Sequence, residues 1–314
     1  MILKKSGLTE KNMRKLTLAL LLFMLSACVH EELQVLVDDS RQRSISYQVL
    51  APADTDTHHP LILISHGSGG EINNHRWLMD ALVNEGYIAA AVNHPGNTTM
   101  DDSSVGVVRV WDRPRDLTLL LDALLADPIW KNRIDQTRIG AAGFSSGGYT
   151  ALALAGARYN GDLLSEYCAA ADHGPDCDLA DPNVEVDFTG STASYRDDRL
   201  SAFFAMAPAV GSAITVDSLQ AIENPVAITA SVDDELVYPR FSAERYAEHI
   251  PGATLNLLPT GGHFIFLECN VGTHVADWFI KDLDLCGSNF DVDRAATRHQ
   301  VAQQAITFFD TNLN

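Results

Sequence analysis

Residues 138–157 constrain the fold of this chain most strongly, because a short apolar run leads there into a glycine-rich turn and then into small, helix-forming residues. The turn holds the motif Gly-Phe-Ser-Ser-Gly at 143–147. A serine on a sharp strand-to-helix turn has a strained backbone, and the residues two before and two after it must be small so that strand and helix can pass closely. The motif glycines meet this requirement for Ser145, whereas centring the turn on Ser146 would put a phenylalanine at the crowded position. The pattern therefore predicts a strand, a turn with Ser145 at its apex, and a helix.

Strand-like and helix-like segments alternate on both sides of this stretch. The strand-like runs are short and apolar, which is typical of strands buried on both faces, and the alternation is that of β-α-β units. We therefore predict an α/β fold, a mostly parallel central sheet with helices on both faces. The expected strands are a leading hairpin at 33–38 and 44–50, then 61–65, 88–92, 138–144, 200–206, 226–231 and 254–258, and the expected helices are 75–85, 115–126 and 294–311.

Residues 158–199 interrupt this alternation. They are rich in Asp, Gly and Pro, hold two cysteines and show little periodic hydrophobicity. We interpret the stretch as an insertion, a lid or loop region over the functional site, within a single domain that spans residues 28–314. A surface insertion without order is the alternative.

The N-terminal segment has the pattern of a bacterial export signal. Arg14 and Lys15 precede an apolar run of about eleven residues, too short to span a membrane as a helix, and Leu-Ser-Ala-Cys follows at 25–28. This ending resembles the bacterial lipobox, in which the cysteine is lipidated and becomes the mature N-terminus. We therefore expect residues 1–27 to be a lipoprotein signal peptide and Cys28 to carry the lipid. A plain signal peptide or an apolar core helix is the alternative.

The expected lipidation places the mature protein in the bacterial cell envelope. The residue after the cysteine is Val29 rather than Asp, which by resemblance to bacterial sorting signals favours the outer membrane, facing the periplasm or the exterior. Met13, directly before the basic residues, would serve as the start of translation.

Acidic residues greatly outnumber basic ones, 41 against 22, which gives a formal net charge of −19. Removing residues 1–27, with five basic residues and one acidic residue, takes the charge from −19 to −23. Such a chain repels phosphate backbones, so we expect no nucleic-acid partner, and membrane attachment would come from the lipid anchor rather than from a basic surface. Long-range attraction of anionic substrates is also disfavoured, although a local arginine cluster could bind one.

Besides the lipobox cysteine, four cysteines remain, an even number for an oxidising compartment. Of the three possible pairings we favour the nearest neighbours, Cys168 with Cys177 and Cys269 with Cys286, because each bond would close a polar, loop-rich stretch. A zinc site is the alternative, but no Cys-x-x-Cys spacing is present. We expect neither a metal site nor a cofactor.

A serine hydroxyl is a weak nucleophile at neutral pH unless a base takes its proton and a third group holds that base. With Ser145 as nucleophile, His263 is the expected base, because it follows the last expected strand and can reach back to the turn. The acid should lie between them in the chain. Asp234 is favoured because Val237, three residues on, can anchor its loop, and Asp233 is the alternative. We expect five other histidines to lie at the surface: His58, His59, His75, His173 and His249.

Attack by a serine on a carbonyl produces a tetrahedral oxyanion, which needs preset N–H donors. One expected donor is the backbone amide of Ser146, directly after the nucleophile. The other should come from the loop His-Gly-Ser-Gly-Gly at 66–70, which follows an expected strand, and we select the Ser68 amide. A glycine-rich turn without a functional role is the alternative.

The order Ser145, Asp234, His263, together with the glycine-rich loop, resembles the α/β-hydrolase superfamily. Four motifs narrow the resemblance to the predicted dienelactone hydrolase group, whose relatives include esterases similar to platelet-activating-factor acetylhydrolase. The match covers most of residues 60–275 and implies the α/β-hydrolase fold. True dienelactone hydrolases use a cysteine nucleophile, so Ser145 implies a serine esterase instead. The motifs are Ile-Ser-His-Gly-Ser-Gly-Gly at 64–70, Asn-His-Pro-Gly-Asn-Thr at 93–98, Asp-Arg-Pro-Arg-Asp at 112–116 and Gly-Phe-Ser-Ser-Gly-Gly-Tyr at 143–149.

The leading hypothesis is an envelope serine hydrolase that cleaves carboxylic esters through an acyl-enzyme. Its partner would be a small-molecule or lipid ester with a short or lipid-derived acyl group. A peptidase of the same fold is the alternative among enzymes. A non-catalytic envelope lipoprotein that binds a ligand is the alternative of another class, and the presence of all three members of the Ser-His-Asp set argues against it.

Overall fold

The computed structural model describes residues 33–55, 57–179, 183–269, 284–286 and 289–313. The expected signal peptide and Cys28 lie outside these residues. The chain divides into an N-terminal unit, residues 1–34, and a main unit, residues 35–314, which holds the fold described below. Among the described residues, no helix combines the length and the apolar character needed to cross a membrane.

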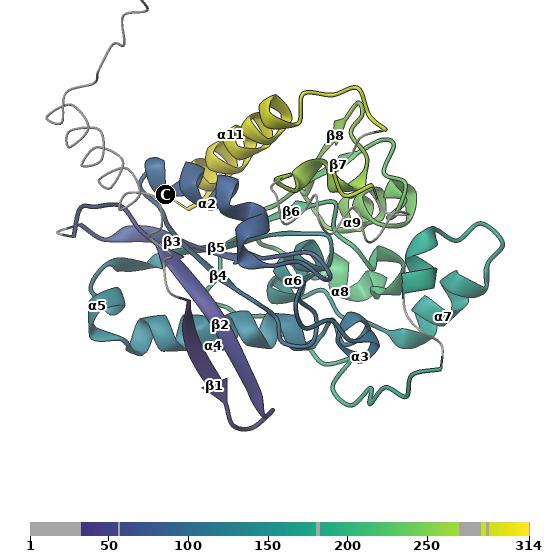
Figure 1. Cartoon of the computed structure of the whole chain (residues 1–314), viewed down its shortest axis with the longest axis horizontal. Helices are drawn as coiled ribbons and strands as arrows, with labels where there is room; N and C mark the ends of the chain where they lie inside the picture. The colour runs from purple at the N-terminus through teal and green to yellow at the C-terminus, as the bar shows by residue number, and fades with distance from the viewer. Residues whose placement is uncertain (1–32, 56, 180–182, 270–283, 287–288, 314) are drawn as a thin grey trace, which may run out of the picture. The chain divides into compact units, whose positions relative to one another are not determined.

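An eight-stranded sheet forms the centre of the main unit (Figure 1). Its strand order is β1-β2-β4-β3-β5-β6-β7-β8, in which β2 pairs antiparallel with β4 and every pairing from β4 through β8 is parallel. The predicted mostly parallel sheet is therefore confirmed. The strands are β1 (Gln34–Asp38), β2 (Arg43–Leu50), β3 (His59–Ser65), β4 (Ile88–Val92), β5 (Ile134–Phe144), β6 (Ala202–Met206), β7 (Val226–Ser231) and β8 (Thr254–Leu258).

Helices cover both faces of the sheet, as predicted (Figure 1). α2 (Arg76–Asn84) and α11 (Arg294–Asn312) pack together on one face, and α4 (Asp112–Ala126) and α6 (Ser146–Ala155) pack together on the other. Further helices within the described residues are α3 (Ser104–Val108), α5 (Pro128–Lys131), α7 (Gly161–Ala169), α8 (Val216–Gln220) and α9 (Ala243–His249), with 3₁₀ segments η1 (Ile72–His75), η2 (Pro175–Leu179), η3 (Gly211–Ala213), η4 (Pro239–Phe241) and η5 (His263–Phe266).

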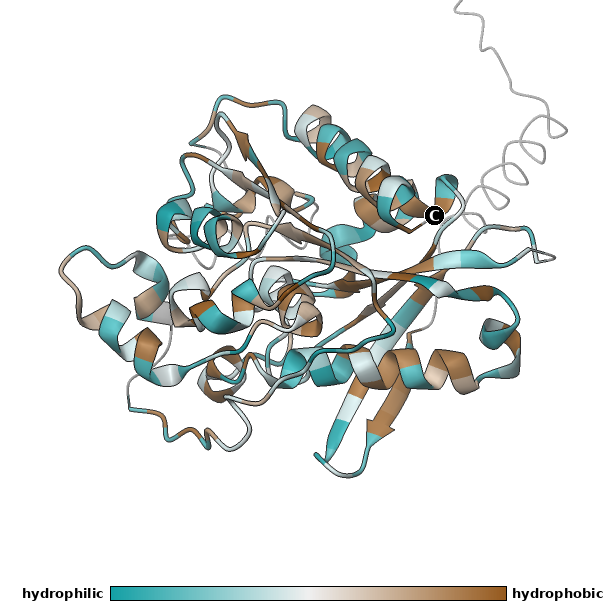
Figure 2. Cartoon of the chain, turned by 180° about the vertical axis from the view of Figure 1, so that it is seen from behind, coloured by the Kyte–Doolittle hydropathy of each residue, from teal (hydrophilic) through white to brown (hydrophobic). Residues whose placement is uncertain are grey.

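The core lies between the sheet and these helices. β4, β6 and β7 are buried at every position, so both of their faces must be covered. α11 buries Val301, Ala305 and Phe309, which recur every four residues and so share one side of the helix. Asp293 caps the start of α11 by accepting a hydrogen bond from the Ala296 amide at 2.9 Å. Figure 2 shows hydrophilic and hydrophobic residues alternating along this helix, as expected when one side is buried.

The parallel strands end together at one edge of the sheet. Their register pairs Ser65 of β3 with Gly143 of β5, and Ser231 of β7 with Leu258 of β8. The loops that follow these four strands therefore emerge at the same edge, where ligands bind in open α/β sheets.

Residues 158–199 contribute α7 and η2, and no strand within their described part. A disulfide joins Cys168 of α7 to Cys177 of η2, with Cα atoms 5.6 Å apart. The Tyr167 hydroxyl donates to Asp176 at 3.0 Å and accepts from the Gly174 amide at 2.7 Å, so the connection is internally bonded. The second disulfide joins Cys269 to Cys286, with Cα atoms 5.4 Å apart. The two pairs are those that we favoured from the sequence.

Candidate active site

The expected strand-to-helix turn is present, with Ser145 between β5 and α6. Ser145 has a φ of 54° and a ψ of −120°, a conformation that residues other than glycine rarely adopt. Close packing explains both motif glycines. A Cβ atom at Gly143 would collide with the carbonyl group of Gly147, and one at Gly147 with that of Ser65. The glycines thus allow α6 to start directly against the end of β3 and to present Ser145 at the carboxyl edge of the sheet.

Ser145, His263 and Asp234 form one hydrogen-bonded series. His263 Nε2 lies 3.0 Å from Ser145 Oγ, and His263 Nδ1 lies 2.7 Å from Asp234 Oδ2. The three residues follow β5, β8 and β7, so the parallel sheet brings them together although Ser145 and His263 are 118 positions apart. All three are buried, with exposed fractions of 7%, 1% and 4% for Ser145, His263 and Asp234. Contact with bulk water therefore weakens neither hydrogen bond.

The two adjacent aspartates, which the sequence left as alternatives, have different partners. Asp234 Oδ1 accepts hydrogen bonds from the backbone amides of Leu236 and Val237, at 3.1 and 2.7 Å, which leaves Oδ2 to face His263. Val237 is buried and anchors this loop.

Asp233 instead supports the loop that carries the histidine. Its carboxylate accepts from the Gly262 amide at 3.0 Å, from the Thr260 hydroxyl at 2.7 Å and from the Ser231 hydroxyl at 2.5 Å. Burial alone would raise the pKa of Asp233, but these hydrogen bonds outweigh it and lower the pKa. The carboxylate thus remains charged while it holds the start of η5.

Three neighbours of His263 were not identified from the sequence: a carboxylate and two aromatic rings. Glu235 accepts a hydrogen bond from the His263 backbone amide at 3.0 Å. The Phe144 ring packs against the imidazole with centroids 4.9 Å apart, and Phe264 meets it edge-on at 5.1 Å. Both contacts limit rotation of the imidazole. Phe144 lies inside the Gly-x-Ser-x-Gly motif, so its position beside Ser145 was the signal available for it.

The glycine-rich loop after β3 lies beside Ser145. A Cβ atom at Gly67 would be 3.4 Å from Ser145 Cβ, so no side chain separates the loop from Ser145 at this point. Ser68 is exposed, and its hydroxyl accepts a hydrogen bond from Asn97 Nδ2 at 2.9 Å. Within the described part of the chain, the backbone amides of Ser68 and Ser146 donate no hydrogen bond to another residue. Both amides thus remain available to a ligand.

A second buried network lies behind this loop. His94 Nε2 is 2.9 Å from Ser65 Oγ, and His94 Nδ1 is 2.9 Å from the Asp116 carboxylate. His66 Nε2 accepts a hydrogen bond from the His94 amide at 3.2 Å. Burial, reinforced by the charge of Arg113, lowers the pKa of both histidines well below the usual value. The two neutral rings therefore support the loop by packing and hydrogen bonding.

Two of the five histidines expected at the surface are buried, so that expectation is wrong for them. His75 has an exposed fraction of 0%, and burial lowers its pKa to about 3. Its ring packs against Phe144 with centroids 5.5 Å apart. His59 is 8% exposed, and its Nδ1 lies 2.8 Å from the Gly86 carbonyl oxygen. In both cases at least one contact comes from a residue distant in the sequence, Phe144 for His75 and Gly86 for His59, and the polar residues nearby did not indicate it.

Among the described residues, no group of three or more His, Cys, Asp or Glu side chains is arranged to hold a metal ion. The site thus combines a serine hydroxyl, an imidazole and a carboxylate in series. The Ser146 amide, directly after Ser145, and the Ser68 amide, in the adjoining loop, have no hydrogen-bond acceptor among the described residues.

Comparison with known proteins finds solved structures that have a similar fold. No protein-family model and no curated protein sequence matches the chain. A ferulic acid esterase from Streptomyces cinnamoneus matches with a TM-score of 0.60 and 19% identity, over 90% of this chain and 88% of that one. Esterase 2 of Thermogutta terrifontis, in a structure phosphoramylated by tabun, matches with a TM-score of 0.51 and 15% identity, over 81% and 95%.

A proposed dipeptidyl aminopeptidase IV from Bacteroides ovatus also matches, with a TM-score of 0.55 and 14% identity over 90% of this chain. The chain spans only 36% of the length of that peptidase. Identities this low concern the fold alone. Together with the strand order and the serine turn, these matches show that the chain has the α/β-hydrolase fold.

Proposed function

We propose that this protein is a serine hydrolase that cleaves carboxylic esters through an acyl-enzyme intermediate. The observation that carries the proposal is the series of hydrogen bonds from Ser145 through His263 to Asp234, 3.0 and 2.7 Å long. This is the arrangement that activates a serine hydroxyl at neutral pH.

In the proposed reaction His263 Nε2 takes the proton of Ser145 Oγ while Oγ attacks the ester carbonyl carbon. The amides of Ser146 and Ser68 donate hydrogen bonds to the oxyanion that forms, each worth roughly 10²- to 10³-fold in rate. The intermediate collapses, the bond to the alcohol oxygen breaks, and His263 returns the proton to that oxygen. Water then attacks the acyl-Ser145 ester, again deprotonated by His263, and releases the acid. Throughout, Asp234 holds the imidazole and stabilises its protonated form.

The resemblance of the motifs to the predicted dienelactone hydrolase group supports an ester with a short or lipid-derived acyl group as the substrate. The match to the ferulic acid esterase extends over 90% of this chain and 88% of the esterase, which also favours an ester as the substrate. A peptidase of the same fold is the second candidate, favoured by the match to the dipeptidyl aminopeptidase.

A substrate panel tests the proposal and separates the two candidates. We expect the chain to hydrolyse p-nitrophenyl esters, with an optimum in a series of acyl chain lengths, and to leave dipeptidyl p-nitroanilides intact. Ser145→Ala should abolish hydrolysis, whereas Ser146→Ala, which keeps the backbone amide, should retain it. Hydrolysis of the anilides in preference to the esters would support the peptidase, and no hydrolysis of either would support a binding role.

Attachment to the cell envelope is a further part of the proposal. It rests on the resemblance of residues 25–28 to a lipobox after a short apolar run and on the two disulfides, which suit an oxidising compartment. The anchor would hold the hydrolase at a bacterial membrane, with the outer membrane favoured by Val29. A lipid ester would be an accessible substrate there.

A further inference from the structure

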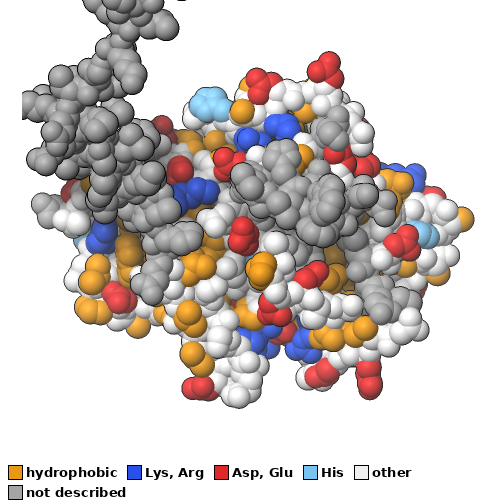
Figure 3. All heavy atoms as spheres, viewed as in Figure 1, with side chains coloured by type: hydrophobic (Ala, Val, Ile, Leu, Met, Phe, Trp, Pro, Cys, Tyr) orange, Lys and Arg blue, Asp and Glu red, His pale blue; other side chains and the backbone are white. Residues whose placement is uncertain are grey.

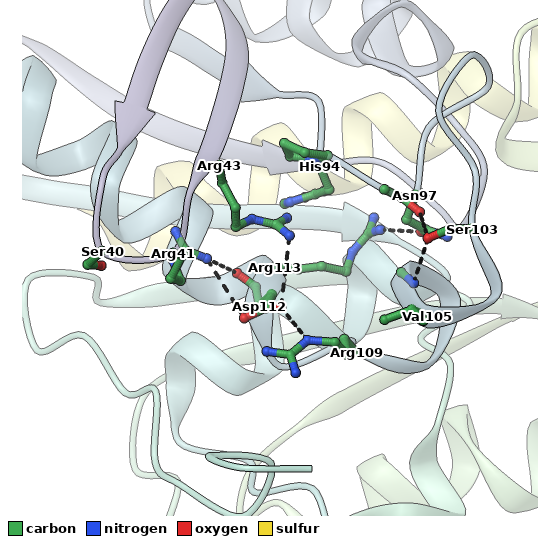
Figure 4. A pocket seen from close by; sticks show the side chains of 13 residues that line it. Ser40, Arg41, Arg43, His94, Asn97, Ser103, Val105, Arg109, Asp112 and Arg113 are labelled. Atoms are coloured by element: carbon green, nitrogen blue, oxygen red, sulfur yellow. Dashed lines mark hydrogen bonds and ion pairs between the residues drawn. The ribbon is translucent and has the colours of Figure 1, made fainter. Parts of the chain in front are cut away.

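A cavity of about 420 Å³ opens beside the glycine-rich loop, between the β1–β2 hairpin, α3 and the start of α4 (Figure 4). Four arginines line it: Arg41 and Arg43 from the hairpin, Arg109 after α3, and Arg113 in α4. Figure 4 shows three of the guanidinium groups gathered around one carboxylate, whereas that of Arg113 points toward Asn97. Figure 3 shows acidic side chains scattered over this face, with a small group of basic side chains near the hairpin.

Two buried carboxylates neutralise part of this charge. Asp116 lies 2.7 Å from Arg41 and 2.8 Å from Arg43. Asp112 lies 2.9 Å from Arg109. One further carboxylate, that of Asp38, pairs with Arg41 at 2.5 Å. The Asp187 carboxylate, 3.9 Å from Arg109, is 71% exposed and contributes little through water.

Arg113 is the cation without a carboxylate. Its side chain is 2% exposed, and within the described residues it forms no ion pair. It donates to Asn97 Oδ1 at 2.7 Å and to the carbonyl groups of His66 and Gly67, while its Nε has no hydrogen-bond partner in the described chain. Burial lowers the pKa of Arg113 to about 9, as expected for a cation that nearby carboxylates do not fully balance.

Among the described residues, the four arginines together therefore have only three well-covered carboxylates as ion-pair partners, those of Asp38, Asp112 and Asp116, although the chain as a whole carries a net charge of −19. Asp101 and Asp102 bond the lining residues Gly96 and Asn97, but both are exposed, so water screens their charge. A buried excess cation is unfavourable unless a counter-ion offsets it. Nη2 of Arg41 is also buried without a hydrogen-bond partner among the described residues. The cavity thus combines space with an excess of positive charge, and two of its lining arginines each keep one buried N–H group without a partner among the described residues.

We infer that this cavity binds a small oxyanion group, a carboxylate or a phosphate. Guanidinium groups match the planar, two-oxygen geometry of both anions, and converging arginines are the usual means of holding them. A volume of about 420 Å³ lies in the range of small-molecule sites. A small anion can bind although the protein is acidic overall. Salt screens the distant acidic residues, so the nearby arginines dominate the electrostatic potential in the cavity.

The cavity adjoins the proposed active site through two of its lining residues. Arg113 donates to the carbonyl groups of His66 and Gly67, and Asn97 donates to the Ser68 hydroxyl. The anion could therefore be the charged end of the substrate itself or a separate ligand bound behind the loop. The two sources share one binding chemistry and differ in kinetics.

Calorimetric titration of the full chain with inorganic phosphate at constant ionic strength tests the inference without relying on catalysis. We expect saturable binding at one site. Arg109→Ala should weaken it about tenfold, since one charge-assisted contact is lost. Arg115→Ala is the matched control: Arg109 and Arg115 both pair with Asp112 three residues away, but only Arg109 lines the cavity. Arg115→Ala should bind phosphate as the unmodified chain does.

A second variant keeps the test informative should Arg109→Ala fold poorly. Val105 lines the cavity and is 37% exposed, so Val105→Asp adds a carboxylate at the entrance with little effect on packing. It should abolish phosphate binding. Absence of saturable binding to the unmodified chain, or equal affinity in the Arg109, Arg115 and Val105 variants, would overturn the inference.

Ester kinetics then identify the source of the anion. If the substrate supplies the anion, Arg109→Ala should raise KM about tenfold for p-nitrophenyl hemisuccinate and leave KM for the uncharged p-nitrophenyl acetate unchanged. Phosphate should then compete with the hemisuccinate. If a separate ligand supplies it, both KM values should stay unchanged and phosphate should not compete. The first pattern supports the site independently of the titration, and the second assigns the phosphate binding measured by titration to a separate ligand. A chain that bound phosphate but cleaved no ester would retain this inference and lose the proposed function.

Discussion

Replacing Asp234 by Asn tests how the proposed active site holds its base. In the structure Asp234 Oδ1 accepts from the amides of Leu236 and Val237, and Oδ2 faces His263 Nδ1 at 2.7 Å. An asparagine must turn its carbonyl oxygen toward the two backbone donors, because the opposite orientation would set its NH₂ group against both. The NH₂ group then faces the imidazole. His263 Nδ1 has to become the acceptor, so the proton moves to Nε2, the atom that must accept the proton of Ser145.

The expected loss follows from this reversed tautomer. The Ser-His-Asp arrangement loses about 10⁴-fold in kcat when the acid becomes an amide. That factor corresponds to about 5 kcal/mol in the activation free energy. The fold should persist, because the asparagine oxygen keeps both backbone hydrogen bonds of Asp234. We expect the free energy of unfolding to change by no more than about 1–2 kcal/mol.

Asp233→Asn is the matched control, since Asp233 bonds Gly262, Thr260 and Ser231 rather than the imidazole. Steady-state hydrolysis of a p-nitrophenyl ester, with urea unfolding of the same samples, measures both effects. We expect Asp233→Asn to change kcat by less than about tenfold and to lower stability by about 1–3 kcal/mol through its lost hydrogen bonds. An Asp234→Asn variant as active as Asp233→Asn would refute the reasoning about the tautomer.

Three further predictions concern stability and location. The buried His75 ring has a pKa of about 3, below the usual 6.5, so unfolding takes up a proton at any pH between these values. His75 therefore lowers the free energy of unfolding by about 1.4 kcal/mol for each pH unit by which pH falls within this range, and His75→Phe removes this effect. The variant should lose that slope in urea unfolding from pH 7 to pH 4, and exposed His58→Phe should keep it. Replacing Cys168 and Cys177 by Ser together opens a loop with a sequence separation of 9 and should lower the free energy of unfolding by up to about 3 kcal/mol, and an unchanged urea midpoint would contradict this. Cys28→Ser should move the protein out of the membrane fraction with esterase activity retained, and a wild-type N-terminus that carries no lipid by mass spectrometry would argue against the anchor.

Local patterns in the sequence were sufficient for the parts of the fold that depend on neighbouring residues. The glycines at 143 and 147 indicated the turn at Ser145, because their requirement is steric and local. Helical spacing indicated 294–311, and the helix spans Arg294–Asn312. Chain order was enough to nominate His263 and Asp234, since loops after parallel strands meet at one edge of the sheet.

Features made by distant segments could not be predicted in this way. β5 begins at Ile134, four residues before the apolar run, because His59 of β3 pairs with it. His75 is buried by contacts such as that with Phe144, almost seventy positions away. The arginine-lined cavity is formed by side chains of the β1–β2 hairpin and of α4, which are far apart in the sequence. The motif at 112–116 contributes two lining residues, but by itself it did not indicate a cavity.

Reaction with a fluorophosphonate, followed by peptide mass spectrometry, tests the central claim most directly. The reagent forms a covalent bond only with a serine whose hydroxyl is activated, so it reports the Ser145–His263–Asp234 series rather than the fold. We predict one adduct per chain, located on Ser145, and a rate of labelling that falls sharply in Asp234→Asn. An unlabelled chain, or an adduct on Ser146 instead, would contradict the account.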